Sequence, residues 1–258
     1  AARDLFRPLS ERGVPILEMD AASAEFTKFA SGAMLAARLS LMNELAEMCE
    51  HLGADVEQVR AGLGHDRRIG TRYLQPGPGF GGPMMPPALR SLAHQARAAG
   101  AVPEILDAVM RVNFRQRQRL VERVLGCVQG AVDPKVAVMG AAFKPGTDCL
   151  TDAPAVTLIE ALLSEGVSVH AYDPLASATL RKTLTGHGAL DVFDDAYGAT
   201  VGTDVLVLAT ADEQWSQLEL ARIRGTMRGA FLIDACNSLP PADVRRAGFA
   251  YQGVGRPE

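Results

Sequence analysis

The C-terminal half of the chain contains a strand-helix-strand pattern, and this pattern restricts the fold more than any other feature. An apolar run over 135–140 ends in Gly140, and a second apolar run covers 167–174. Between them lie apolar residues at helical spacing: Ala155, Leu158, Ile159, Leu162 and Leu163. This alternation is typical of a β-α-β unit. We therefore expect an α/β fold with a doubly wound parallel sheet.

The region before this pattern is predicted to be helical. A helix over 23–52 has apolar residues on most of its faces, as expected when more than one partner covers it. Gly53 ends this helix, and Asp55 caps a second one over 56–63. A further helix is expected from about 88 to 99. The sequence thus divides into a helical block over about 22–126 and an α/β block over 134–258.

A segment rich in glycine and proline lies within the helical block. Residues 75–88 contain four glycines and five prolines. Proline has no backbone donor, and glycine loses the most backbone entropy on ordering. We therefore predict neither helix nor central strand for this segment, but a loop of defined shape.

This loop resembles the one that carries the nucleophilic cysteine in the UDP-glucose/GDP-mannose dehydrogenase family, Pro-Gly-Pro-Gly-Phe/Tyr-Gly-Gly-Ser-Cys-Phe-Pro-Lys-Asp. The cysteine position is held by Met84 and the aspartate position by Ala88. Pro87 and Pro83 replace the family's lysine and serine. The family oxidises a sugar alcohol through a thiohemiacetal and a thioester, which require a thiolate. A methionine thioether forms neither adduct, so the resemblance implies a degenerate active site.

The long helix also resembles the family's central helix, Ala-Glu-x-x-Lys-Tyr-x-x-Asn followed by Lys-Ile-Ser-Phe-x-Asn-Glu. Lys28 matches the catalytic lysine, whose ammonium stabilises developing negative charge. Gly32 stands in place of the asparagine one helical turn later. In the family this helix forms the dimer interface, so the resemblance implies a homodimer through 23–52.

The resemblance further implies a set of substrate-binding residues. Arg68, Tyr73 and Leu74 match the Arg-Ile-Gly-x-x-Phe/Tyr-Leu segment, whose arginine reaches into the partner subunit's substrate site. A guanidinium suits a diphosphate because its donors form a fixed fork. Lys144 matches the Gly-x-Ala-Phe-Lys-Pro segment at the end of the first strand. The substrate-binding residues implied are Arg68, Tyr73, Leu74, Phe80, Gly81 and Lys144.

Other ligand-facing positions of the family pattern are replaced, whereas framework positions are kept. In the segment after Lys144 the second aspartate, the arginine and the serine become Cys149, Thr151 and Ala153. The arginine of the Asp-x-Arg-Asn strand end becomes Cys236. The closing run over 248–256 resembles the family's ending Gly-x-x-Tyr-x-Gly-x-Gly-Arg. The C-terminal block is therefore expected to be the Rossmann-like UDP-binding domain.

The family's N-terminal NAD domain is expected to be absent from this chain. Residues 1–21 resemble its last helix and connecting strand, a remnant of that domain. The one Gly-x-Gly-x-x-Gly string, over 77–82, follows no strand and opens no helix, so it predicts no dinucleotide site. No cofactor and no cofactor-binding residues are expected, although the family uses NAD. The sequence leaves open whether the absence is natural.

Composition points to an intracellular, cytoplasmic protein. The net charge of -4 gives no broad attraction to nucleic acid, and the arginines over 111–119 are expected on a solvated helix. No apolar run is long enough to span a membrane. The four cysteines lack paired ligand spacing, so they are expected to be reduced and to bind no metal.

Three functions follow from these expectations. The first is a non-catalytic protein that keeps the dimer scaffold, binds a nucleotide sugar or assists a partner enzyme. The second is an enzyme of altered chemistry on a nucleotide-linked substrate, using Lys28. The third is a fragment of an NAD-dependent nucleotide-sugar dehydrogenase.

Overall fold

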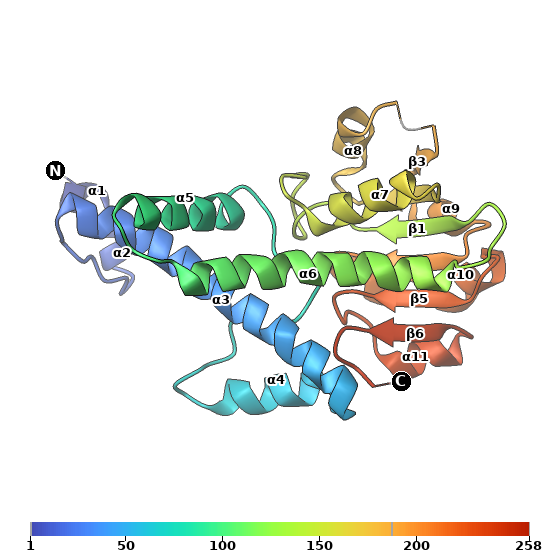
Figure 1. The fold of residues 1–258 in the computed structure, drawn as a ribbon, viewed down its shortest axis with the longest axis horizontal. Helices are drawn as coiled ribbons and strands as arrows, with labels where there is room; N and C mark the ends of the chain where they lie inside the picture. Colours follow the sequence, from blue (N-terminus) through green and yellow to red (C-terminus); the bar gives the residue numbers. More distant parts are fainter. Residues whose placement is uncertain (1, 187, 258) are drawn as a thin grey trace.

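The chain folds into a helical part and a sheet part that share one long helix. A computed structural model describes residues 2–186 and 188–257. The helical part comprises α3 (Ala21–Leu52), α4 (Val56–His65), α5 (Met85–Ala98) and α6 (Glu104–Cys127), preceded by the short helices α1 (Ala2–Leu5) and α2 (Arg7–Ser10). Figure 1 shows α6 running from beside α5 to the sheet. This helix connects the two parts.

The sheet part contains, within the described residues, six parallel strands in the order β3-β2-β1-β4-β5-β6. The strands are β1 (Lys135–Met139), β2 (Ser168–Tyr172), β3 (Leu190–Val192), β4 (Val205–Leu208), β5 (Phe231–Asp234) and β6 (Ala250–Gly253). The chain builds outward from β1 to β3 and then returns to β4 on the other side of β1. The strand order therefore reverses between β1 and β4, which is where such sheets bind ligands.

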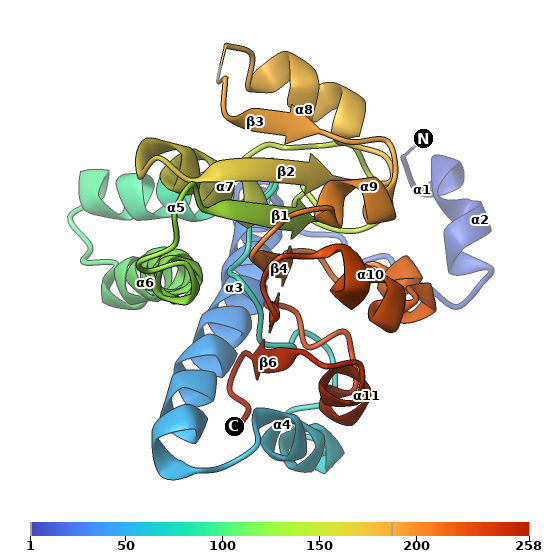
Figure 2. The ribbon, with the colours of Figure 1, turned by 90° about the vertical axis from the view of Figure 1, so that its right-hand side faces the viewer.

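Helices cover both faces of the sheet (Figure 2). Val136 and Val138 pack on α6 and α7 (Pro154–Ser164), and α8 (Ser177–Thr183) extends this layer. Ala137 and Met139 face the opposite layer. That layer consists of α9 (Ala196–Thr200), η1 (Glu213–Gln217), α10 (Leu220–Thr226) and α11 (Pro241–Arg246). Successive side chains of a strand point to opposite faces, so strands covered on both faces are apolar throughout. The predicted doubly wound α/β fold is confirmed.

The helix ends follow local signals in the sequence. Gly53 closes α3 in the left-handed conformation with φ 71°, and the Asp55 side chain accepts a hydrogen bond from the Glu57 N–H at the start of α4. Both were predicted. Helix α3 starts at Ala21, two residues before the predicted start, because the Asp20 side chain accepts a hydrogen bond from Ser23 N.

Two expectations about local structure were wrong. The glycine- and proline-rich segment is not a loop to its end, because α5 begins at Met85 and its first turn contains Pro86 and Pro87. Proline is accepted there because the first helical N–H groups have no partner within the helix. Residues 14–20, expected to resemble a connecting strand, form no strand.

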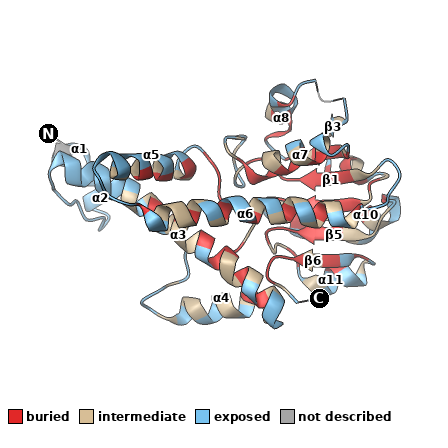
Figure 3. Ribbon diagram, in the orientation of Figure 1, coloured by how far each residue is buried: buried red, intermediate tan, exposed pale blue. Residues whose placement is uncertain are grey.

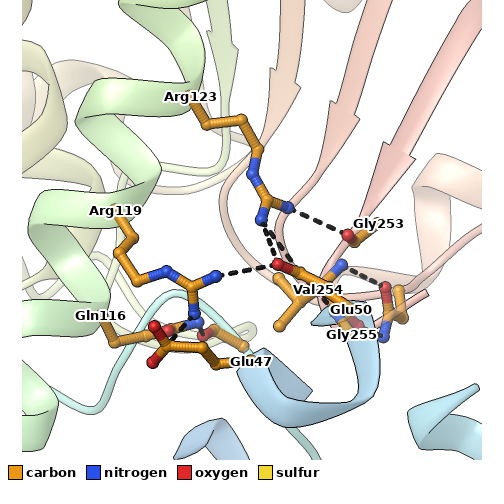
Figure 4. A network of polar contacts seen from close by, with 10 residues as sticks. Glu47, Glu50, Gln116, Arg119, Arg123, Gly253, Val254 and Gly255 are labelled. Carbon is orange, nitrogen blue, oxygen red and sulfur yellow. Dashed lines mark hydrogen bonds and ion pairs between the residues drawn. The ribbon is translucent and has the colours of Figure 1, made fainter. Parts of the chain in front are cut away.

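Charged side chains tie α3 and α6 to the last strand. The Glu50 carboxylate pairs with Arg119 and Arg123, and it accepts a hydrogen bond from Gly255 N at 2.8 Å. Arg123 also donates to the carbonyl of Gly253 at the end of β6. Figure 4 shows both guanidinium groups converging on Glu50. The arginines of α6 were expected on a solvated helix, but the carboxylates of α3 hold Arg119 in a half-buried position.

These contacts favour the ionised form of Glu50. Burial opposes ionisation, but the Gly255 N–H and the guanidinium groups of Arg123 and Arg119 outweigh burial and hold the pKa of Glu50 below its ordinary value of 4.5. The stabilisation is therefore present above about pH 4.5 and is lost as the pH falls through the lower folded-state pKa.

Glu50→Gln should lower the free energy of unfolding by about 2–4 kcal/mol at pH 7, because it removes the carboxylate that pairs with the half-buried guanidinium groups of Arg119 and Arg123. Urea unfolding at pH 7 and pH 4 measures the change, which should be smaller at pH 4. Glu44→Gln is the control, since Glu44 forms an exposed pair with Arg115 at 3.9 Å. Equal losses in the two variants would contradict a structural role for Glu50.

Candidate functional site

A cleft of about 530 Å³ opens where the helical part meets the carboxyl edge of the sheet. One wall is the loop over 75–84 together with α3 and the start of α5. The other wall is formed by the ends of β1, β4 and β5, including Phe143, Lys144, Thr210 and Cys236. The cleft therefore lies at the reversal of strand order, the position at which open α/β sheets bind their ligands.

Close packing of the 75–84 loop requires its glycines. A Cβ on Gly81 would lie 2.1 Å from the carbonyl oxygen of Asp152, and a Cβ on Gly82 would meet the ring of Phe143 at 2.5 Å. Gly79 and Gly82 also have positive φ angles of 109° and 88°. Side chains at these positions would push the two walls apart, so the glycines set the width of the cleft.

Side chains of α3 and α6 hold the backbone of this loop. Asn43 on α3 accepts a hydrogen bond from Gly77 N at 2.8 Å, and Gln116 on α6 donates to Gly77 O at 2.7 Å. Asn113 accepts from Phe80 N at 2.8 Å and donates to Phe80 O at 3.1 Å. Arg117, whose side chain is 10% exposed, donates to Phe80 O and pairs with Asp152. The loop is therefore fixed by polar contacts to two helices.

The sheet wall is assembled at the ends of β1 and β4. Gly140 has a φ of 88°, and a Cβ there would lie 1.9 Å from Thr210 Oγ1, so the two strand ends approach closely. The Trp215 indole N–H donates to the Thr210 carbonyl at 2.7 Å. The Lys144 ammonium lies 5.6 Å from the centre of the Phe143 ring. Among the described residues that line the cleft, Lys144 is the one cation.

The structure brings together part of the predicted site. Tyr73, Phe80, Gly81, Lys144 and the replacement residue Met84 all line the cleft. Met84 is 60% exposed and precedes the first turn of α5. Tyr73 has an unusual φ of 58° for a residue with a side chain. A sulfur without a proton therefore stands in the cleft at the position where the family pattern has a thiol.

Other predicted residues lie outside the cleft. Leu74 is buried in the core between α3, α4 and Val254. Arg68 is 89% exposed and forms an ion pair with Asp66 at 2.6 Å. Lys28 lies on the exposed first half of α3, and Gly32 follows one turn later, where an added Cβ would meet no atom within 4 Å. Ala88 lies in the first turn of α5. The roles assigned to these residues stay predictions.

Several cleft residues were not among the substrate-binding residues predicted from the sequence. Asn43, Gln75 and Thr210 line the cleft, and Asn43 belongs to the helix motif that the sequence matched. Cys236 lines the cleft as well, yet burial, followed by the charge of Asp234, raises the pKa of its thiol. Such a thiol is not converted to a nucleophilic thiolate at neutral pH. Burial therefore argues against Cys236 as a nucleophile in this cleft.

Within the part of the chain that the structure describes, the acidic, histidine and cysteine side chains form no metal centre. No cluster of three or more of them has the arrangement needed to hold a metal ion. None of the described helices is long and apolar enough to cross a membrane.

Fold and site define a doubly wound α/β protein in which a helical region closes a cleft at the carboxyl edge of the sheet. Family models agree: residues 22–115 match the central domain of the UDP-glucose/GDP-mannose dehydrogenase family, and residues 137–241 match its UDP binding domain. The chain belongs to the UDP-glucose/GDP-mannose dehydrogenase family.

Named relatives match nearly the whole chain. The UDP-glucose 6-dehydrogenase of Pseudomonas aeruginosa is 42% identical over 99% of this chain and 57% of its own length. That of Rhizobium meliloti is 32% identical over 99% of this chain and 58% of its own length. A UDP-glucose dehydrogenase structure from Pyrobaculum islandicum superimposes with a TM-score of 0.86 at 28% identity, over 99% of this chain and 56% of that one. The chain thus spans less than three fifths of these relatives.

Asn113→Ala should lower the free energy of unfolding by about 1–3 kcal/mol, because it leaves the buried Phe80 N–H without its acceptor and removes one donor to the Phe80 carbonyl. Thermal or urea unfolding checks this value. Gln118→Ala, exposed on the same helix, should change stability by less than about 0.5 kcal/mol. A loss no larger than that of Gln118→Ala would contradict the described anchoring of the loop.

Proposed function

We propose that this chain is a nucleotide-sugar-binding protein that keeps the ligand cleft of its family but does not perform the thiol-dependent oxidation of the sugar. The observation that carries this proposal is the composition of the cleft. Its framework residues and Lys144 are in place, whereas Met84 occupies the position of the nucleophile. The cleft therefore keeps groups that can bind a ligand but carries no thiol at the position of the family's nucleophile.

Three properties of the cleft support a nucleotide-sugar ligand. Its volume of about 530 Å³ falls in the range of small-molecule sites. Lys144 supplies a point charge for a phosphate, and the rings of Tyr73 and Phe143 offer apolar surface to a base or a sugar face. Family models assign the sheet part to a UDP binding domain, which supports a UDP-sugar in particular.

The chemistry of the cleft argues against the covalent steps. A thiohemiacetal forms when a thiolate attacks an aldehyde carbon, and the Met84 thioether has no S–H to deprotonate. Cys236 is the sulfur on the sheet wall, and its thiol is buried. Neither sulfur supports a thioester intermediate. The altered-chemistry alternative relies on Lys28, and no contact places Lys28 in the cleft.

The family also implies NAD, and the described residues do not fit a dinucleotide. The glycine string over 77–82 forms the cleft loop, and its backbone groups at Gly77 and Phe80 already bond to α3 and α6. At the β1–α7 turn, the N–H groups of Ala141 and Ala142 bond to Asp173 instead of facing a pyrophosphate. These residues support no step through nicotinamide.

We also propose that the chain forms a homodimer through α3. Apolar side chains lie exposed along this helix: Phe26, Phe29, Met34, Leu41 and Met48. Figure 3 shows that the first half of α3 and the N-terminal helices are largely exposed, whereas the strands are buried. An apolar stripe of this length is typical of an interface. The four free cysteines support a reducing, cytoplasmic location.

Saturating UDP or UDP-glucose should stabilise the chain, by about 2.7 kcal/mol at a hundred times the dissociation constant. Lys144→Ala should weaken binding by about tenfold, because it removes a charge-assisted contact. Melting temperature and the fluorescence of Trp215, the single tryptophan, report binding. Lys182→Ala, exposed on α8, is the matched control.

Two outcomes would contradict the proposal. A melting temperature unchanged by UDP- and GDP-sugars would exclude nucleotide-sugar binding and leave a scaffold role. Reduction of NAD by the purified chain in the presence of UDP-glucose, followed by absorbance of the reduced cofactor, would exclude the non-catalytic role.

Light scattering should give a mass twice the 27.4 kDa of one chain. The double variant Phe26→Arg, Met34→Arg should be monomeric, because it places charges in the apolar stripe of α3. Val132→Arg, at an exposed apolar site in the loop before β1, should remain dimeric. A monomeric wild-type chain at micromolar concentration would refute dimerisation through α3.

A further inference from the structure

Asp173 lies directly after β2, and it is 5% exposed. Its carboxylate accepts hydrogen bonds from backbone N–H groups of two turns. Oδ2 accepts from Ala141 at 2.7 Å and Ala142 at 3.0 Å. Oδ1 accepts from Leu175 at 2.9 Å and Ala176 at 2.7 Å. One side chain therefore joins the turn after β1 to the turn after β2.

The turn after β1 leads directly into the cleft wall. Ala141 and Ala142 are buried, and the next two residues, Phe143 and Lys144, line the cleft. Gly140 N donates to Tyr172 O at 2.8 Å, so three successive N–H groups of this turn are held by the end of β2. The Phe143 ring in turn packs against Gly82 of the opposite wall.

We propose that Asp173 is a positioning residue for ligand binding: it fixes the backbone of the turn after β1 and thereby holds Lys144 and Phe143 in the cleft. Asp173 does not line the cleft itself. Its effect on the ligand passes through the two N–H groups of Ala141 and Ala142.

The geometry requires a carboxylate at this position. Each oxygen of Asp173 accepts two N–H groups, so both oxygens are needed as acceptors. An asparagine has one acceptor oxygen and an NH₂ group that only donates. Asp173→Asn therefore leaves one pair of buried N–H groups facing a donor, and the turn after β1 or the turn after β2 has to move.

A double-mutant cycle with UDP as the probe tests this inference. Calorimetry on the full chain compares wild type, Asp173→Asn, Lys144→Ala and the double variant. Asp173→Asn should weaken UDP binding by about tenfold in the wild-type background, as expected when a supporting residue releases a positioned group. It should have a smaller further effect in the Lys144→Ala background, because one of the two groups that it positions has been removed.

Two results of the cycle would overturn the inference. If the losses of the two single variants multiply in the double variant, Asp173 acts independently of Lys144. If Asp173→Asn binds UDP as tightly as wild type, the contacts of its carboxylate do not matter to the ligand. Should Asp173→Asn fail to fold, Asp173→Glu, which keeps both oxygens but displaces them by one methylene, takes its place in the cycle.

The expected loss of UDP binding rests on the proposed function. A second measurement, made without ligand, tests the positioning role separately from that function. Amide hydrogen exchange of Asp173→Asn should be faster at residues 141–144 and unchanged in β4 and β5. Ser177→Ala is the control, since Ser177 Oγ bonds to the backbone of Asp173 and Phe193 but not to the turn after β1. If wild type binds no UDP, the proposed function fails while this exchange pattern still supports positioning. Uniformly faster exchange, or unchanged exchange at 141–144, would overturn it.

Discussion

The hydrogen bonds between α6 and the loop over 75–84 are the contacts on which the cleft depends. Helix α6 packs its apolar residues Leu120 and Val124 on the sheet, and its polar residues Asn113, Gln116 and Arg117 bond to the loop. The same helix reaches α3 and β6 through Arg123 and Glu50. Because one rigid element contacts both walls, the width of the cleft depends on helix packing as well as on the glycines of the loop. A loop this rich in glycine would otherwise have many conformations.

This arrangement is compatible with the proposal that the chain binds a ligand without thiol chemistry. The residues that shape the cleft are backbone groups, glycines and helix side chains, none of which reacts. Met84, which stands where the family pattern has its cysteine, is exposed at the edge of the cleft. Substitution at an exposed cleft position leaves the framework unstrained. The fold is therefore compatible with ligand binding in the absence of thiol chemistry.

The sequence predicted the sheet well because strands buried on both faces leave continuous apolar runs, as in β1 and β4. It also predicted the ends of α3 and α4, which depend on the local conformation of Gly53 and a side-chain cap from Asp55. It missed the contacts of Arg119, Asn113 and Asp173, because their partners lie 30 or more residues away in the chain. The first turn of α5 was missed because proline breaks a helix in its interior, whereas Pro86 and Pro87 lie in the first turn, where proline is accepted. Lys144, Phe80 and the ligand-facing position of Cys236 were found through family motifs, whereas Thr210 reaches the cleft only through the strand order.

The proposed function depends most on whether the cleft between the 75–84 loop and the carboxyl edge of the sheet is the nucleotide-sugar site. Amide chemical-shift mapping by NMR during titration with UDP-glucose tests this most directly. We predict that the largest shift changes fall in residues 75–84, 140–145 and 209–211, with the exposed Arg68 and Lys28 regions little affected. Changes concentrated elsewhere, or none at all at millimolar ligand, would contradict it.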